Sequence, residues 1–489
     1  MPFTMGLDIG TSNIKVIIFD TDVGKISDSS HCPTPIYHPL PEQSEHNPEL
    51  LWQVIASVIR GIAYKFDIKA IGISSFAEAG LPLNSDFEAI YPIIAWHDRR
   101  TMPLVKEIKS KISEQEIFSI TGQKVGFSFG LLKILWLKKH HPEIFDNTAK
   151  WVSVPDYIHF KLSGQLATDY TQASRTLMFD QSKKEWSKRL MQIVGFSSRQ
   201  LPEIYPSGTA IGSITKSAIE ITGLNKKTLC VLGGHDHLCG AYACGGSTPE
   251  EMIDSMGTSQ ALIAFSSNFK PSKKILDAGY VHYAHVTPRK YLYKGGLKAA
   301  GKILSWSEKV FKHSVKLYDE AALSGYSPDL PYWLPSFHGS GTPFRQPQAQ
   351  AVLFGLNPNH TGEDISLALL ESFAFWLRLN FDLMTKITEH TPKKLIAIGG
   401  ANQNKALQLF KASIINKIIM IPNTPEASAV GAALLAAVGC GIASSIQDGM
   451  KLNAYPLELI HPNKNISTII NDRYFNEYLP MRRRMRANI

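Results

Sequence analysis

The sequence has few cysteines and no long apolar run, and both absences narrow the classes of protein to which it can belong. Its 489 residues include only five cysteines, which are scattered and form no C-x-x-C pair. Neither a disulfide framework nor a zinc site is therefore expected. No apolar stretch reaches the roughly 18 to 20 residues that a membrane-spanning helix needs. The first residues, MPFTMGLDIG, also lack the pattern of a secretion signal. We expect a cytoplasmic protein with reduced thiols and no membrane contact.

Positive charge is in only modest excess over negative charge. The chain has 51 lysines and arginines against 42 acidic residues, which gives a net charge of +9. Most of the excess is dispersed, and the one dense cluster consists of Arg482, Arg483, Arg484 and Arg486. A solvated tail is the favoured interpretation, so no nucleic-acid partner is expected, although a nucleic-acid-binding tail would show strongly salt-dependent affinity. The dispersed charge suits anionic small molecules such as nucleotides and sugar phosphates.

The length and the order of apolar segments predict two α/β domains. One core rarely serves 489 residues, so we expect domains of roughly 200 to 250 residues. Residues 5–20 read as a β-hairpin, 48–64 as an amphipathic helix and 70–74 as a further strand. This succession is typical of an α/β layer fold. Further helices are expected at 131–140, 151–162 and 297–306.

The turn of the first hairpin carries groups suited to phosphate. Gly10 lets the backbone approach a ligand, while Thr11, Ser12 and Lys15 supply donors for phosphate oxygens. Asp8 would then lie where a hydrated Mg²⁺ bridges those oxygens, because Mg²⁺ prefers one or two carboxylates together with water and phosphate. An ordinary hairpin turn is the alternative interpretation.

A second copy of this turn occurs in the second half of the chain. Residues 256–259, MGTS, repeat residues 9–12, IGTS, and Asp254 precedes the second copy much as Asp8 precedes the first. Each copy leads into an apolar strand. Two related domains that each present one phosphate-binding hairpin would explain the pair, and coincidence on so short a string is the alternative.

The segment GGHDH at 233–237 predicts a general base. An apolar strand ends in two glycines, which clear space around a carboxylate at the start of a small-residue helix. Asp236 would accept the proton of a hydroxyl that is already positioned beside a phosphoryl group. Metal chelation by His235, Asp236 and His237 is the alternative. It is disfavoured because side chains at positions i and i+2 of a helix diverge.

Three other loops supply candidate binding residues. Glu78 is the only charged residue in the loop 75–80, which leaves the end of a strand. Trp96 could cover a carbon chain and Asp98 could accept sugar hydroxyls, although a helix start with surface ion pairs explains them equally well. A strand at 395–398 ends in two glycines followed by Ala401. A nucleoside could lie there against bare backbone, with Asn404 forming hydrogen bonds.

The order of these motifs resembles that of the FGGY family of carbohydrate kinases over nearly the whole chain. DIGTSNIK and SMGTSQAL are similar to the family's two phosphate motifs, GGHDHLCGA to the segment with the catalytic aspartate, and IGGANQNKALQLF to the adenosine motif. Residues 155–164, 168–176 and 351–356 match further blocks. The resemblance implies two ribonuclease-H-like (actin-like ATPase) α/β domains with a cleft between them. The N-terminal sugar-binding domain would span 1–245 and the C-terminal nucleotide-binding domain 246–489.

The resemblance also implies a reaction, in which the γ-phosphate of MgATP passes to a hydroxyl of a ketose or polyol, a terminal primary one by our expectation. It implies that Asp236 is the general base and Asp8 belongs to the Mg²⁺ shell. The remaining roles fall on Thr11, Gly257 and Thr258 for the phosphates and on Gly301, Gly400 and Asn404 for adenosine, while His237 could read the sugar. The partners would be ATP and a small sugar or polyol, and a homodimer is the one oligomer that we consider.

The sequence departs from two branches of the family at the acceptor loop. Ala77 and Glu78 stand where the glycerol-kinase branch has arginine and glutamate, and the tyrosine expected near Phe129 in that branch is absent. The Met-His pair of xylulokinase-like members is missing as well. Glycerol is therefore disfavoured as the acceptor. The alternative function is a nucleotide-binding regulatory or sensor protein on the same fold that phosphorylates no sugar.

Overall fold

The computed structural model describes residues 2–311 and 326–487. The first half of the chain forms a six-stranded sheet in the order β13-β14-β5-β1-β2-β3. Strands β1, β2 and β3 are antiparallel, whereas β5 and β14 run parallel to β1. The strands are β1 (Phe3–Ile9), β2 (Asn13–Asp20), β3 (Lys25–Pro33), β5 (Ile68–Ser75), β13 (Ala210–Ser213) and β14 (Leu229–His235). Their apolar side chains form one continuous core with the first helix.

The second half forms a seven-stranded sheet in the order β17-β18-β16-β15-β21-β22-β23. Its strands are β15 (Glu251–Met256), β16 (Gln260–Ser266), β17 (Val281–Ala284), β18 (Tyr291–Leu297), β21 (Lys394–Ile398), β22 (Ile418–Pro422) and β23 (Leu457–Ile460). The segment β18-β16-β15-β21-β22 has the same order and directions as β3-β2-β1-β5-β14. Two ribonuclease-H-like units are therefore present, as the family resemblance implies.

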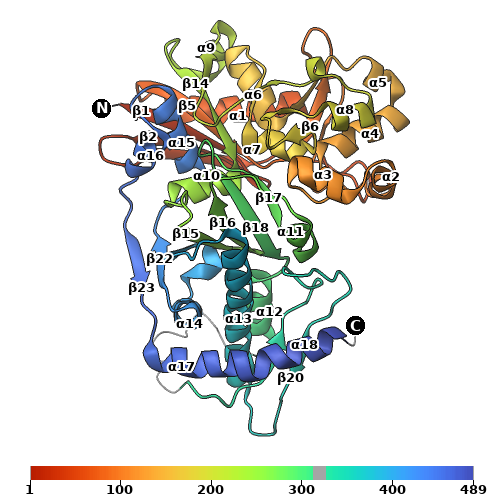
Figure 1. Cartoon of the computed structure of the whole chain (residues 1–489). Helices are drawn as coiled ribbons and strands as arrows, with labels where there is room; N and C mark the ends of the chain where they lie inside the picture. Colours follow the sequence, from red (N-terminus) through yellow and green to blue (C-terminus); the bar gives the residue numbers. More distant parts are fainter. Residues whose placement is uncertain (1, 312–325, 488–489) are drawn as a thin grey trace.

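Helices cover both sheets, and a mostly helical subdomain extends from the first (Figure 1). Helix α1 (Pro48–Ala63) begins where Asn47 caps it and proline takes a first-turn position, and it buries an apolar face against the sheet. The subdomain contains α2 (Leu104–Lys111), α3 (Glu114–Thr121), α4 (Gly130–His140), α5 (Pro142–Asp146) and α8 (Lys188–Val194). The second sheet packs against α12 (Gly301–Phe311), α13 (Gly362–Thr388) and α14 (Lys405–Ile415).

Helix α15 (Ala427–Gly439) returns from the second half of the chain to the first sheet. Figure 1 shows α15 and α16 (Ile446–Lys451) beside β1 and α10 (Asp236–Ala243), far from α13. Glycines allow a very close approach: a Cβ atom at Gly6 would lie 1.9 Å from the carbonyl oxygen of Ala429, and one at Gly72 would lie 2.1 Å from that of Ala432. A domain boundary at 245/246 stays a prediction. The two sheets lie on either side of it in the sequence, but α15 comes from the second half of the chain and packs on the first sheet.

Two expected helices begin later than the sequence indicates. Lys150–Ser153 is a strand, β8, and helix α6 starts at Val154. Its start is favoured by Pro155 in the first turn and by Asp156, which accepts a hydrogen bond of 2.8 Å from the backbone amide of Ser153. Likewise β18 continues through Leu297, and α12 starts only at Gly301.

All five cysteines are free, which agrees with the expected absence of a disulfide framework. Within the described ranges no helix is both long and apolar enough to cross a membrane. Of the terminal arginine cluster, Arg482, Arg483 and Arg484 lie on α18 (Leu479–Ala487), and the side chain of Arg486 lies outside the described residues.

Candidate active site

Asp236 is the first residue of α10, directly after β14. Its carboxylate accepts a hydrogen bond of 2.6 Å from the backbone amide of His237, and it lies 3.2 Å from Nε2 of His235. The backbone carbonyl of Asp236 accepts a hydrogen bond from Ser428 of α15 at 3.0 Å. Gly234 is needed beside it, since a Cβ atom there would lie 2.8 Å from Val286 of the second half. Asp236 thus stands at the contact between the two halves.

Asp8 on β1 is a second carboxylate of the same site. It accepts a hydrogen bond of 2.9 Å from the hydroxyl of Ser74, its partner on the parallel strand β5. Burial and then the negative charge of Asp236 raise the pKa of Asp8 to about 7, and burial raises the pKa of Asp236 to about 6. Carboxylates that repel each other in this way form a donor set that fits a hydrated Mg²⁺.

The His-Asp-His cluster differs from expectation in its geometry. Ligand atoms of His235, Asp236 and His237 all lie within 4.8 Å of one another. They converge because His235 is still extended, with φ −63° and ψ 130°, so the helical divergence does not apply. The positive charge of Lys294 and then burial lower the pKa of His237 to about 3. That ammonium group opposes a metal cation at this point.

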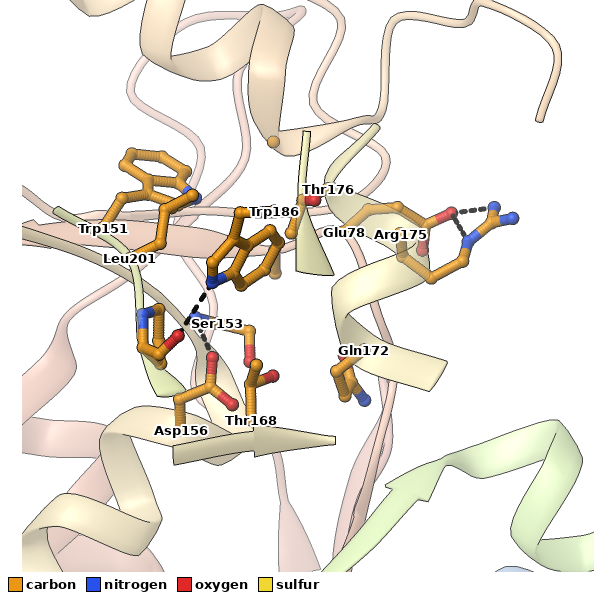
Figure 2. Close-up of a pocket in the computed structure, with 13 residues that line it drawn as sticks. Glu78, Trp151, Ser153, Asp156, Thr168, Gln172, Arg175, Thr176, Trp186 and Leu201 are labelled. Carbon is orange, nitrogen blue, oxygen red and sulfur yellow. Dashed lines mark hydrogen bonds and ion pairs between the residues drawn. The ribbon is translucent and has the colours of Figure 1, made fainter. Parts of the chain in front are cut away.

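Glu78 lies beside Asp236 and forms an ion pair with Arg175, whose Nε is 2.9 Å from Oε1 of Glu78. The same guanidinium donates to the side chain of Gln123 at 2.8 Å. Figure 2 shows Glu78 and Arg175 facing each other at one edge of a small cavity. The cavity behind them holds about 20 Å³, which is room for about one water molecule and too little for a sugar. The space behind this ion pair therefore does not admit a molecule of that size.

The two predicted residues of the 96–98 segment separate in the structure. Trp96 is 38% exposed, and its indole nitrogen donates to the hydroxyl of Thr11 at 3.0 Å, so it lies against the first hairpin. Asp98 is fully buried, and its oxygens accept hydrogen bonds from Arg100 and from the amide of Ser44. No face of Asp98 is left for a sugar, so we assign it to holding this loop instead of the predicted substrate contact.

The first hairpin presents Thr11 and Ser12 as exposed side chains. Lys15 instead pairs with Glu426 at 2.5 Å, across from the N-terminal end of α15. The second hairpin differs from the first in its acidic residue. Asp254 is fully buried in an ion pair with Lys411, whereas Asp8 faces the site. The two copies share their backbone, but only the first offers a carboxylate to a ligand.

A pocket of about 650 Å³ opens beside the second hairpin. Six predicted residues line it: Gly257, Thr258, Gly301, Gly400, Ala401 and Asn404. Small residues are required here, because a Cβ atom at Gly301 would lie 2.3 Å from the carbonyl oxygen of Gly257. Three segments far apart in the sequence therefore form one pocket of a size that suits a nucleoside.

Family models decide the identity of the chain. The model described as the FGGY family of carbohydrate kinases, N-terminal domain, matches residues 3–243, and the corresponding C-terminal domain matches residues 253–440. The chain belongs to the FGGY family of carbohydrate kinases. It is an ATP-dependent carbohydrate kinase, a phosphotransferase that acts on a small sugar or polyol.

Three proteins illustrate the similarity of this FGGY kinase to known members. A xylulose kinase from Lactococcus lactis subsp. lactis (strain IL1403) is 28% identical, with 91% of this chain and 90% of the relative covered. A glycerol kinase from Thermococcus kodakarensis is 27% identical, with 89% and 88% covered. The solved xylulose kinase from Rhodospirillum rubrum superposes with a TM-score of 0.90 at 22% identity, with 99% of each chain covered.

Sequence reasoning missed several polar residues of the FGGY kinase site. Arg175 falls within the matched family block 168–176, and Tyr283 and Lys294 fall in none of the motifs described above. Lys294 had a local signal, since it is the one charged residue in the otherwise apolar segment 291–297. Tyr283 and Arg175 had no such signal, because tertiary packing alone brings Arg175 to Glu78 and Tyr283 to Arg175.

Proposed function

We propose that this FGGY kinase phosphorylates a terminal primary hydroxyl of a ketose or polyol, with Asp236 as general base. The observation that carries the proposal is the position of Asp236 between two sets of groups. The charge of Asp236 acts on Asp8, and the charges of Glu78 and its partner Arg175 act on Asp236. A carboxylate so placed can serve an acceptor hydroxyl and a phosphoryl donor together.

In the proposed reaction the acceptor oxygen attacks the γ-phosphorus of ATP in line. A bond forms between these two atoms while the bond from phosphorus to the bridging oxygen breaks, and ADP leaves with that electron pair. The hydroxyl proton passes to the carboxylate of Asp236. With its pKa raised only to about 6, Asp236 is largely ionised at neutral pH and able to accept that proton.

Residues of both halves would hold the donor. The pocket beside the second hairpin would take adenosine against Gly301, Gly400, Ala401 and Asn404. The phosphates would then lie between the two hairpins, near Thr11, Ser12, Gly257 and Thr258, with Lys15 close by. Magnesium held through Asp8 would neutralise phosphate charge.

Acceptor recognition would fall to Glu78, Trp96 and His237. The ion pair with Arg175 fixes the direction of the Glu78 carboxylate, which can accept hydrogen bonds from sugar hydroxyls. The side chain of His237 is about half exposed and kept neutral by Lys294, so it can both donate and accept.

The test is sugar-dependent release of ADP across a panel of ketoses and polyols. Replacing Asp236 by Asn preserves shape but removes the base, so the turnover number should fall by roughly 10² to 10⁴ while ATP still binds. Asp22→Asn, at an exposed position on the turn after β2, is the matched control and should behave like wild type. Normal turnover by Asp236→Asn would refute the assignment of the base, and ATP hydrolysis indifferent to every sugar would refute the proposed transfer.

A further inference from the structure

Lys294 occupies an unusual position for a lysine. It lies within β18, where its neighbours on the adjacent strands are Ile263 and Val281. Its side chain is only partly exposed. The ammonium group makes no hydrogen bond or ion pair with any residue in the described part of the chain. A partly buried cation without a protein partner is costly unless a ligand pairs with it.

Tyr283 lies on the same face of the second sheet as Lys294. Tyr283 pairs with Leu292, and side chains of residues 292 and 294 point to the same side because strands alternate with period two. The ring of Tyr283 lies 5.6 Å from the guanidinium of Arg175, the partner of Glu78. Its hydroxyl is buried and has no partner within the described ranges. This face therefore forms a wall opposite Glu78.

Strand β17 fixes that wall to the first half of the chain. The amide of His282 donates to the carbonyl of Gly122 at 2.7 Å, and the amide of Ala284 donates to the side chain of Gln181 at 3.0 Å. Tyr283 lies between these two hydrogen bonds. These bonds fix the position of the wall relative to the first half of the chain, which carries Glu78.

The charge of Lys294 interacts with the same groups that surround Glu78, namely Arg175 and Asp236. Besides Ser74, the groups that act most on the pKa of Asp8 are Asp236 and the ion pair of Lys15 with Glu426 beside the first hairpin. The charges that act on Asp236 are instead Lys294, Glu78 and Arg175. Lys294, Glu78 and Arg175 therefore form one group of charges around Asp236.

We propose that Lys294 is a specificity-determining residue for the acceptor, and that it selects an acceptor with a proton-free oxygen, a ketone carbonyl or a carboxylate, near the attacked hydroxyl. This inference rests on the proposed function. An ammonium group has three donors and no acceptor, so it matches an oxygen without a proton better than a hydroxyl group. The hydroxyl of Tyr283 supplies a further donor on the same wall.

The experiment compares three acceptors of equal chain length: a ketose, the polyol formed by reducing its carbonyl, and the corresponding sugar acid. Wild type should prefer the ketose or the sugar acid to the polyol, and the better of the two identifies the oxygen. Lys294→Met should lose roughly 10- to 100-fold in kcat/KM on the preferred acceptor but much less on the polyol, because a charge-assisted hydrogen bond is lost. The KM for ATP should stay unchanged.

Two further variants make the result decisive. Lys294→Arg keeps the positive charge and should retain the wild-type acceptor preference, which would show that the loss in Lys294→Met does not come from impaired folding. The matched control is Lys274→Met, at an exposed position of α11 (Lys273–Ala278). An equal loss on all three acceptors, or no loss, would overturn the inference while wild-type turnover still upheld the proposed function. Wild type that releases no ADP with any sugar would overturn both.

Discussion

A methyl group at Gly72 should weaken both the stability and the activity of the enzyme. Its Cβ atom would lie 2.1 Å from the carbonyl oxygen of Ala432 and 2.9 Å from the carbonyl carbon, both in the backbone of α15. Because neither backbone can rotate away, α15 has to move off β5 by about 1 Å. Overpacking of a core typically costs about 1 to 3 kcal/mol, and a clash between two backbones belongs at the upper end. We expect Gly72→Ala to lower the free energy of unfolding by about 3 kcal/mol.

The same displacement should reach the chemistry. Ser428 of α15 donates to the backbone carbonyl of Asp236, and a Cβ atom at Gly431 would lie only 2.0 Å from the carbonyl oxygen of Cys239 on α10. A shift of α15 therefore carries Asp236 with it. Misplacing a catalytic group by 1 Å can cost about 10² in rate, so kcat should fall well below wild type even where Gly72→Ala is fully folded.

Urea unfolding and steady-state kinetics together check this prediction, with Gly61→Ala as the control. Gly61 lies on α1, where an added Cβ atom meets no other atom within 4 Å. Alanine there should stabilise the protein by up to about 1 kcal/mol, because glycine is a poor helix former. If Gly72→Ala were as stable as Gly61→Ala, or folded and fully active, the reasoning from the α15 contact would be refuted.

Two other buried groups yield predictions. Asp254→Ala leaves Lys411 buried without its counter-charge, so the free energy of unfolding in urea should fall by about 3 to 5 kcal/mol. Adding Lys411→Met should restore much of that stability, because no buried charge is then left unpaired. A double variant no more stable than Asp254→Ala alone would contradict this reasoning. Burial lowers the pKa of His159 to about 3. Below about pH 6.5 this histidine is therefore protonated in the unfolded chain but stays neutral in the folded chain. Relative to His159→Gln, wild type should therefore lose about 1.4 kcal/mol of stability per pH unit between about pH 6 and 4; parallel pH profiles of urea unfolding would contradict this.

Groups that are contiguous in sequence were the predictable part of the site. Each hairpin turn is a short local motif, and both form as expected. The strand-to-helix junction at Asp236 is also local, since two glycines and a small-residue helix mark it. The pocket beside the second hairpin could be anticipated because the family resemblance supplied Gly301 and Asn404 as well as the second hairpin.

Features that depend on tertiary packing could not be read in this way. Asp98 and Asp254 look like available carboxylates in the sequence, yet each is buried with a cation from another position. The ion pair between Glu78 and Arg175 joins residues 97 positions apart. Helix α15 consists mostly of small apolar residues, and this composition does not say which sheet the helix covers.

The return of α15 to the first sheet has a consequence for synthesis of the chain on the ribosome. The last strand of that sheet, β14, is complete at His235, but the helix that covers β1 and β5 ends only at Gly439. At about 5 to 20 residues per second, roughly 10 to 40 seconds separate the two events. During that interval the nascent first domain exposes the apolar surface that α15 later covers. We therefore expect the nascent domain to bind chaperones, and a fragment that ends before α15 should aggregate unless the missing helix is supplied in trans.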